Sequence, residues 1–438
     1  KQSKEYLVLL ELLDGIWGET DGIYNDFRYY QLENSHGRFV KIEDCHKKDY
    51  HMQMLVERAQ EKSLIECNRI LTEEISSEVV NEYQPPLKLK WYNRSMLAKY
   101  SGRNKGIQGN TNSCYIDSFL YSMFVSTTLF DSILRNTEYE GEIKKVHEIL
   151  TTEIVYPLRK NGFVSASKVA MLRECISIIK NDRSFLNNEK DPEEFLVCLL
   201  SDFFKFDNNL KLSTNSETYC YQLFSEKLDK VDVPSVEQLF VHSLVKNNLR
   251  IQTIPFYVIL QMPRDGVRFK MYDYIFPSPT LDITNMIVGY PRKCEACGDA
   301  AIVECLDCFD IRGVLTLCKN CFVKYHNNEE NRELHNYEIL TISKDYETNK
   351  ESVALDLLAV ICIETSHYVS FTRMGGKSDV WSFFDSMSAR EDGINSQNYP
   401  NVEFLNVFKE MNFNGEKTPL KSNMLKNPLT KRFVRDVY

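Results

Sequence analysis

Apolar residues recur along the chain with two spacings, which together predict a mixture of helices and strands. Between residues 116 and 123 they follow the 3/4 spacing of an amphipathic helix, expected over residues 115–125. A second helix is expected over residues 192–205. Asp191-Pro192-Glu193-Glu194 favours a helix start there, because proline at the first helical position loses no hydrogen bond.

Strands are predicted where β-prone residues form short runs between turn residues. Residues 254–261 indicate a buried strand, and further strands are expected at 353–363, 367–373 and 380–384. Near the start, runs at 27–30 and 38–42 lie in a segment rich in glycine and aromatic residues. These runs predict a small all-β module over residues 1–45, followed by a polar, helix-compatible connector over residues 46–105 that Pro85-Pro86 interrupts.

Composition sets limits on the class of protein. The 438 residues allow two to four domains, and few glycines (17) and prolines (13) disfavour long low-complexity segments. A net charge of −9 disfavours a nucleic-acid partner, because phosphate backbones need a basic surface. No long apolar run is present, so no membrane insertion is expected. The first residue is Lys1 rather than methionine, which suggests a fragment.

Cysteine spacing provides the first candidate chemistry. Six of the thirteen cysteines form three CxxC pairs, and two histidines follow them. Close pairs in a large chain indicate thiolate metal ligands in a reducing compartment, so we expect a cytoplasmic protein with two structural Zn²⁺ ions. The alternatives are unliganded buried cysteines and solvent-exposed histidines, and the spacing permits either sequential or interleaved pairing. The eight candidate ligands are Cys294, Cys297, Cys305, Cys308, Cys318, Cys321, His326 and His335.

A second candidate site involves a thiol, an imidazole and a carboxylate. Cys114 follows a Gly/Asn/Ser/Thr-rich stretch and opens the helix predicted at 115–125, where the helix dipole favours thiolate. His367 begins a predicted strand, and Asp385 ends another that could lie beside it. This order is typical of papain-like cysteine proteases. Taken singly, the three residues could be a core cysteine, a surface histidine and a turn aspartate.

Four motifs resemble those of ubiquitin-specific proteases and occur in that family's order. Residues 106–118 resemble the cysteine box, 366–368 with 381–386 the histidine box, and 191–196 and 261–264 two intervening motifs. The resemblance implies an α+β papain-like fold with a helical thumb and a β-rich palm, in two parts at 106–290 and 339–438. It also implies a thiol deubiquitinase acting at the C-terminal glycine of ubiquitin. Cys114 would attack, His367 would move protons and Asp385 would fix the imidazole.

Two further resemblances concern modules around the protease. Residues 291–338 are similar to a B-box zinc finger, which implies that Cys294, Cys297, Cys318 and Cys321 hold one zinc and the remaining four ligands the other. Residues 21–40 resemble the second half of a CAP-Gly domain. Together these modules imply a branch of the family that acts in signalling on lysine-sixty-three-linked and linear polyubiquitin, with signalling adaptor proteins as further partners.

The chain departs from these families at two informative positions. Gly109 stands where ubiquitin-specific proteases usually have an oxyanion-stabilising asparagine, so backbone N–H groups such as that of Cys114, or Asn110 or Asn112, would have to serve. Glu19 replaces the lysine of the CAP-Gly groove, so microtubule binding is not expected. The missing asparagine favours an alternative, a catalytically weak ubiquitin-binding scaffold, whereas the retention of Cys114, His367 and Asp385 together favours an enzyme.

Overall fold

The computed structural model divides the chain into two compact units, residues 1–77 and 78–438, and each unit is described by itself. No helix in the described part of the chain is long and apolar enough to cross a membrane. The described residues are 7–11, 23–24, 27–28, 37–41, 94–206, 210–224, 226–228, 231–265, 269–310, 313–327, 335–347, 351–375, 380–390, 397–411 and 428–438.

The first unit contains two pairs of antiparallel strands. Strand β1 (Leu7–Glu11) pairs with β4 (Gly37–Lys41), and β2 (Ile23–Tyr24) pairs with β3 (Phe27–Arg28). Strands are therefore present at both predicted β-prone runs. Glu19 and the connector up to residue 93 lie outside the described residues, and the CAP-Gly assignment stays a prediction.

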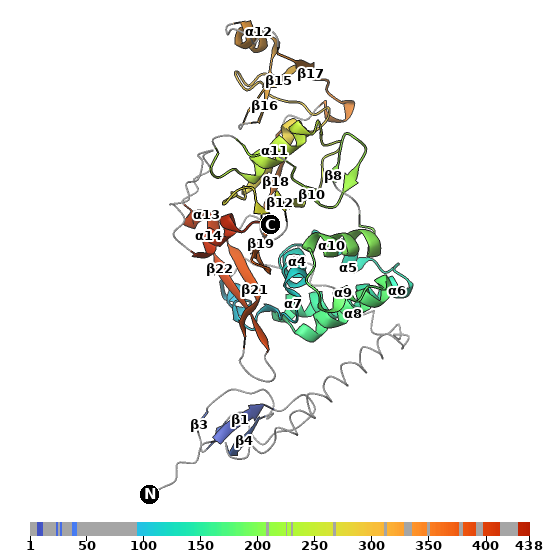
Figure 1. Ribbon diagram of the computed structural model, residues 1–438, viewed down its shortest axis with the longest axis vertical. Helices are drawn as coiled ribbons and strands as arrows, with labels where there is room; N and C mark the ends of the chain where they lie inside the picture. The colour runs from blue at the N-terminus through green and yellow to red at the C-terminus, as the bar shows by residue number, and fades with distance from the viewer. Residues whose placement is uncertain are drawn as a thin grey trace. The chain divides into compact units, whose positions relative to one another are not determined.

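Helices make up one part of the second unit, around the central helix α4 (Cys114–Phe124) (Figure 1). The predicted helix at 115–125 is thus confirmed, but it is not amphipathic in its surroundings: every residue except Phe119 is buried. Tyr121 stacks on Phe384 of the sheet, and Tyr115 packs against Phe195 on the other side. The neighbouring helices are α3 (Arg94–Lys99), α5 (Asp131–Arg135), α6 (Gly141–Glu148), η3 (Ile149–Val155), α7 (Tyr156–Asn161), α8 (Ala166–Lys180), α9 (Ser184–Asn187), α10 (Pro192–Val197) and η4 (Cys198–Phe203).

Helix α10 begins where the sequence predicts. Asp191 is its N-cap, and its carboxylate accepts a hydrogen bond from the Glu193 N–H at 2.9 Å, which satisfies a donor left free at the helix start. The helix then continues as η4, a π-helix, so the predicted segment 192–205 is helical to Phe203 but changes its hydrogen bonding half way.

A five-stranded antiparallel sheet packs against α4, with strand order β19-β20-β21-β22-β5 (Figure 1). Thr365 and Ser366 form the turn between β19 and β20, and Thr365 has φ +57°. The residues on either side of this turn, Glu364 and His367, lie opposite each other in the sheet. The predicted strand at 353–363 is in fact two strands in different sheets, because β18 (Ala354–Asp356) pairs with β14 (Thr280–Asp282). The sheet comprises β19 (Ala359–Glu364), β20 (His367–Arg373), β21 (Trp381–Arg390), β22 (Asn398–Leu405) and β5 (Gly102–Arg103).

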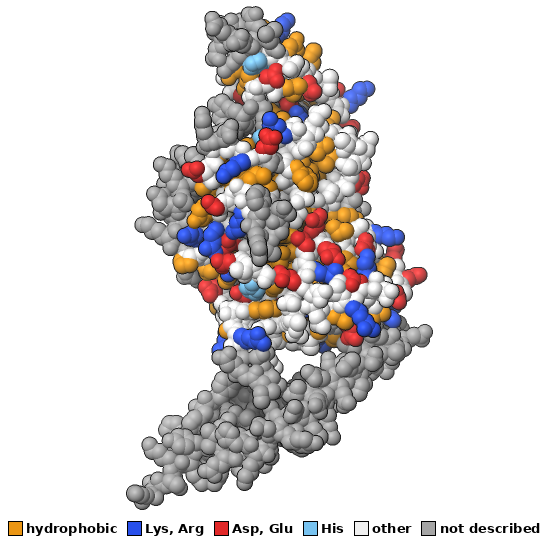
Figure 2. Space-filling model, viewed as in Figure 1, with side chains coloured by type: hydrophobic (Ala, Val, Ile, Leu, Met, Phe, Trp, Pro, Cys, Tyr) orange, Lys and Arg blue, Asp and Glu red, His pale blue; other side chains and the backbone are white. Residues whose placement is uncertain are grey.

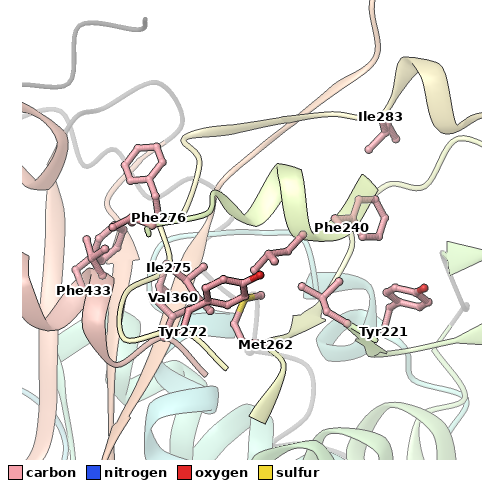
Figure 3. Packing of buried hydrophobic residues seen from close by; sticks show 14 of the residues in the cluster. Tyr221, Phe240, Met262, Tyr272, Ile275, Phe276, Ile283, Val360 and Phe433 are labelled. Carbon is pink, nitrogen blue, oxygen red and sulfur yellow. The ribbon is translucent and has the colours of Figure 1, made fainter. Parts of the chain in front are cut away.

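A large hydrophobic cluster lies on the other face of this sheet, between β19–β21 and helices α11 (Val236–Lys246) and α14 (Pro428–Arg435). Figure 3 shows Phe240 of α11, Val360 of β19 and Phe433 of α14 among its members. Shorter elements connect these parts: β6 (Gly106–Ile107), β7 (Phe163–Val164), β8 (Leu210–Lys211), β9 (Glu217–Thr218), β10 (Tyr221–Gln222), β11 (Leu260–Gln261), β12 (Arg264–Asp265), β13 (Phe269–Lys270), η5 (Thr284–Met286), η7 (Lys344–Tyr346) and α13 (Val407–Glu410).

The predicted buried strand at 254–261 is wrong over most of its length. Only β11 (Leu260–Gln261) is a strand, pairing in parallel with β10, and Phe256 is 87% exposed. Pro255 carries no N–H for a strand ladder, which is one physical reason why the apolar run does not pair.

The cysteine-rich segment forms its own small sheet, in which β15 (Val303–Asp310) lies between β16 (Gly313–Leu317) and β17 (Tyr337–Ile339). Helix α12 (Lys319–Asn327) follows β16 in the chain. Glu304 of β15 is buried and forms ion pairs with Arg292 and with Arg250, the latter at 2.7 Å. Since Arg250 follows α11, these contacts attach the segment to the rest of the unit.

Candidate active site and zinc clusters

Cys114 is the first residue of α4, and a tight turn places it there. The Ser113 N–H donates to the Asn110 carbonyl, and the Asn110 N–H donates back to Ser113 Oγ, both at 2.8 Å. Asn112 takes φ +55°, which asparagine tolerates better than most residues. The first N–H groups of a helix have no intrahelical acceptor, so the Cys114 sulfur lies beside an electropositive helix end.

The structure brings His367 and Asp385 to this thiol. His367 Nε2 lies 2.8 Å from Asp385 Oδ1, and the His367 ring is close enough to Cys114 for the sulfur to favour the charged imidazole, while the Cys114 sulfur donates to the neighbouring Ser366 carbonyl at 3.8 Å. Because Nε2 is bonded to Asp385, Nδ1 is the nitrogen available to Cys114. The three side chains form a relay in the order thiol, imidazole, carboxylate.

The surroundings of His367 and Asp385 favour the charged forms of both side chains. Burial lowers the pKa of His367, but its hydrogen bonds and its attraction to Asp385 and Cys114 outweigh burial and raise that pKa to about 10. Burial raises the pKa of Asp385, but the His367 ring and the Met387 N–H outweigh burial and hold the pKa of this carboxyl below its ordinary value. At neutral pH the imidazole is therefore a cation held by a carboxylate.

Asp385 does not end its strand, contrary to the prediction. β21 continues to Arg390, and its register with β22 shifts between Asp385 and Ala389. Such an irregularity turns a side chain away from the alternation of the strand, and Asp385 Oδ1 accepts the Met387 N–H within it at 2.9 Å.

Gly109 is closely enclosed by side chains of β21, so a larger residue would require them to move. A Cβ at this position would lie 2.6 Å from Met387 Cγ and 2.9 Å from Ser386 Oγ. The Gly109 N–H donates to the Ser386 carbonyl, and the Gly109 carbonyl accepts from Asn398 Nδ2 at 3.0 Å. The asparagine usual in ubiquitin-specific proteases could therefore not occupy this position unless the side chains of Met387 and Ser386 moved.

Of the alternative oxyanion donors, Asn112 is already engaged, because its Nδ2 donates to the Asn187 carbonyl at 2.9 Å. The Asn110 side chain and the backbone N–H groups at the start of α4 remain as candidate donors.

Sequence reasoning missed two charged residues that support the site. Arg173 of α8 is buried and donates to the carbonyls of Thr111 (2.8 Å) and Phe185 (2.7 Å), which fixes the loop before Cys114. Asp117 of α4 is fully buried beside the same loop. An arginine or aspartate inside a helical pattern ordinarily indicates a solvent-facing position, so the sequence carried no signal for either role.

A cleft of about 440 Å³ has α4, α10, β11 and β19 in its wall, and α4 is also the helix that Cys114 opens. The lining is mostly apolar but includes the carboxylate of Glu193. At its edge Tyr438 donates a hydrogen bond to Asp191 and accepts one from Gln261 Nε2 at 2.9 Å. Figure 2 shows that acidic and basic side chains are interspersed on the face it draws, so the net charge of −9 is not concentrated in one patch there.

The structure gathers the eight candidate metal ligands into two clusters of four, whose ligand atoms lie within 4.8 Å of one another. The sets are interleaved, as the B-box resemblance implies. They consist of Cys294, Cys297, Cys318 and Cys321, and of Cys305, Cys308, His326 and His335.

The donor chemistry of both clusters fits zinc. Tetrahedral Zn²⁺ with bonds of about 2.3 Å to sulfur sets its ligands about 3.7 Å apart. Cys297 Sγ and Cys318 Sγ are 3.7 Å apart, and His326 Nε2 lies 3.3 Å from Cys305 Sγ. The other ring nitrogen of His326 is 3.1 Å from the Phe322 carbonyl, which orients Nε2 towards a metal. Both clusters could therefore hold zinc, with every position filled by protein.

Comparisons with known proteins agree with the site. No family model matches the chain. Ubiquitin carboxyl-terminal hydrolase CYLD of Homo sapiens is 35% identical over 416 residues, which cover 91% of this chain and 43% of that protein. The Mus musculus protein of the same name is 36% identical with the same coverage, so the chain spans less than half the length of the curated relatives it matches.

Among solved structures, the SAGA Ubp8/Sgf11/Sus1/Sgf73 DUB module bound to ubiquitin aldehyde aligns over 68% of this chain and 69% of that chain. The TM-score is 0.36 and the identity 10%, a likeness too weak to support an argument. The sequence relationship is much stronger, and over 91% of its length the chain is homologous to part of CYLD, a ubiquitin carboxyl-terminal hydrolase.

Proposed function

We propose that the chain is a cysteine-type ubiquitinyl hydrolase of the ubiquitin-specific protease type, with a papain-like fold. The observation that carries the proposal is the relay of Cys114, His367 and Asp385, assembled from a helix start and two strands distant in sequence. Homology to CYLD supports ubiquitin as the substrate.

In this mechanism the Cys114 thiolate attacks the carbonyl carbon of the bond at the ubiquitin C-terminal glycine. N–H groups at the start of α4 stabilise the oxyanion that forms. His367, held as a cation, donates its Nδ1 proton to the leaving amine and then takes a proton from the water that hydrolyses the thioester. Asp385 keeps Nε2 protonated and directs Nδ1 towards the sulfur.

The cleft walled by α4, α10, β11 and β19 suits an extended peptide with basic side chains. The ubiquitin tail is basic, and the cleft offers apolar walls with Glu193 in its lining and Asp191 at its edge. Opposite charge in a partly enclosed cleft favours the correct register of such a peptide.

The finer parts of the function rest on the resemblances. We propose that residues 291–338 are a B-box with two structural zinc ions, that residues 1–45 are a CAP-Gly-like module, and that the protein acts in the cytoplasm. Lysine-sixty-three-linked and linear polyubiquitin chains are the proposed substrates, with signalling adaptors as partners. The clusters of thiols support a reducing compartment and zinc.

A ubiquitin probe with a C-terminal propargylamide tests the catalytic proposal, because it forms a covalent adduct only with an active thiol. Wild type should gain the mass of one ubiquitin and Cys114→Ala should not. Binding of ubiquitin without labelling of wild type would instead support the scaffold that Gly109 suggests. A panel of all diubiquitin linkages then tests the chain preference.

A further inference from the structure

Asp117 connects to the turn directly before Cys114 through two hydrogen bonds. Its carboxyl Oδ2 accepts the Ser113 hydroxyl at 2.7 Å, and Ser113 Oγ in turn accepts the Asn110 N–H at 2.8 Å. Ser113 is the residue directly before Cys114. The carboxylate therefore sets the direction of the Ser113 hydroxyl, which closes the turn that presents the sulfur.

The same carboxyl also faces the strand that carries the third member of the relay. The Ser386 hydroxyl lies near enough to favour its charged form, although neither Ser386 Oγ nor Asp117 Oδ1 has a hydrogen-bond partner within ordinary distance among the described residues, and the Ser386 carbonyl accepts the Gly109 N–H at 2.9 Å. Ser386 follows Asp385 in β21. Asp117 thus lies between the turn before the nucleophile and the strand that holds Asp385.

The charged and titratable groups around Asp117 come from three elements. Arg173 of α8 and His367 of β20 favour its charged form, and Tyr115 lies on its own helix. Burial nevertheless dominates, because the side chain is fully enclosed, and raises the pKa of Asp117 to about 7. Above pH 4 this carboxyl costs folding stability, since the unfolded chain ionises more readily than the folded one.

We propose that Asp117 is a positioning residue of the active site, which in its carboxylate form orders the Ser113 turn and stabilises the His367 cation that activates Cys114. The proposal rests on Cys114 being the nucleophile of the proposed function. Protonated Asp117 would donate to Ser113 Oγ instead of accepting from it, and its charge would no longer act on His367. The reactivity of Cys114 should therefore rise with pH near neutrality.

The test measures alkylation of Cys114 by iodoacetamide between pH 5.5 and 9, read from the mass of its peptide in the zinc-loaded full chain. In wild type the rate should show a step near pH 7. In Asp117→Asn, which keeps the acceptor for Ser113 but loses the charge, the step should vanish and the rate at pH 8 should fall about tenfold, the equivalent of one pKa unit. Ser113→Ala, which removes a bond favouring the charged form, should move the step to higher pH.

Thermal unfolding separates this role from a structural one. Asp117→Asn should unfold at pH 8 no earlier than wild type, because it removes a buried charge, although it reacts more slowly. The matched control is Asp202→Asn, an exposed aspartate paired with Lys180, which should change neither rate nor pH profile. If Asp117→Asn fails to fold, the proposal is tested by Ser113→Ala alone, through the shift of the pH at which the alkylation rate rises.

Two results would overturn the proposal: a rate for Asp117→Asn within twofold of wild type with the same step, or an unmoved step in Ser113→Ala. Hydrolysis of a fluorogenic ubiquitin amide, measured in parallel, keeps the two proposals apart. A wild-type chain with the alkylation step but no hydrolysis would remove the proposed function and retain the role of Asp117. Hydrolysis with no effect of either variant would remove only the role of Asp117.

Discussion

Replacing Asp385 by asparagine removes one charge from the relay and almost nothing else. The two side chains have the same shape, and the Met387 N–H, which Asp385 Oδ1 accepts at 2.9 Å, can still be accepted by the amide oxygen. The lost quantity is the attraction between the carboxylate and the His367 cation, whose bonded atoms are 2.8 Å apart.

The size of this loss follows from the geometry. Charge centres about 4 Å apart attract by about 4 kcal/mol at the effective dielectric constant of about 20 that suits partly buried pairs. The neutral hydrogen bond that remains is worth about 1 kcal/mol, so the net loss is about 3 kcal/mol. Since 1.36 kcal/mol corresponds to a factor of ten, kcat/KM should fall about 150-fold.

The assay is hydrolysis of ubiquitin joined by an amide to a fluorophore, from pH 5 to 10, with Glu403→Gln on the neighbouring strand as an exposed control. The loss should appear mainly in kcat, because Asp385 acts on the reacting imidazole. A kcat/KM within threefold of wild type would refute the reasoning and remove Asp385 from the relay.

Folding stability gives an independent measure with a defined sign. His367 has its pKa raised from 6.5 to about 10, so its contribution is complete below pH 6.5 and is lost as pH rises through 10. Asp385 has its pKa lowered from 3.8, so its contribution is present above pH 3.8 and is lost in stronger acid. The stability difference between wild type and Asp385→Asn in urea should therefore be greatest between about pH 4 and 6.5. A difference that grew towards pH 9 would contradict the assignment.

Three further changes test the nucleophile, the core and the metals. Cys114→Ala should abolish hydrolysis while ubiquitin affinity, measured by calorimetry, stays within a few-fold; residual turnover would exclude Cys114 as the nucleophile. Phe433→Ala should lower the free energy of unfolding by about 3–5 kcal/mol, because this fully buried ring packs against three aromatic rings, whereas Phe224→Ala at an exposed site should cost under about 1 kcal/mol. Metal analysis should find two zinc ions in wild type and in Cys220→Ala, but at most one in Cys305→Ala; a zinc-free wild-type chain prepared without chelator would exclude the zinc sites.

Local signals made the start of α4 and the strand of His367 predictable. The turn residues before Cys114 and the apolar spacing after it determine the local structure over only a few residues. The same holds for the β-rich run that ends in the Thr365–Ser366 turn. These elements form where the sequence indicates.

Other features depend on contacts distant in sequence, and the sequence did not reveal them. Asp385 lies inside β21 rather than at its end, because pairing with β22 continues past it with a shifted register. The apolar residues near Phe256 do not form a strand, since pairing depends on a partner that β10 supplies for only two residues. The interleaving of the zinc ligands likewise follows from how β15, β16 and α12 fold back, which spacing alone left open.

The order of the relay along the chain has a consequence for synthesis of the protein. Cys114 and Ser366, whose carbonyl lies 3.8 Å from its sulfur, are separated by 252 residues. At about 5–20 residues per second, a ribosome needs roughly 13–50 s to pass from the nucleophile to its base. During that interval the cysteine-rich segment emerges and can bind metal, while the thiol has no imidazole beside it. Under the proposed function, we therefore expect the nascent chain to have no hydrolase activity until β20 and β21 have joined the sheet.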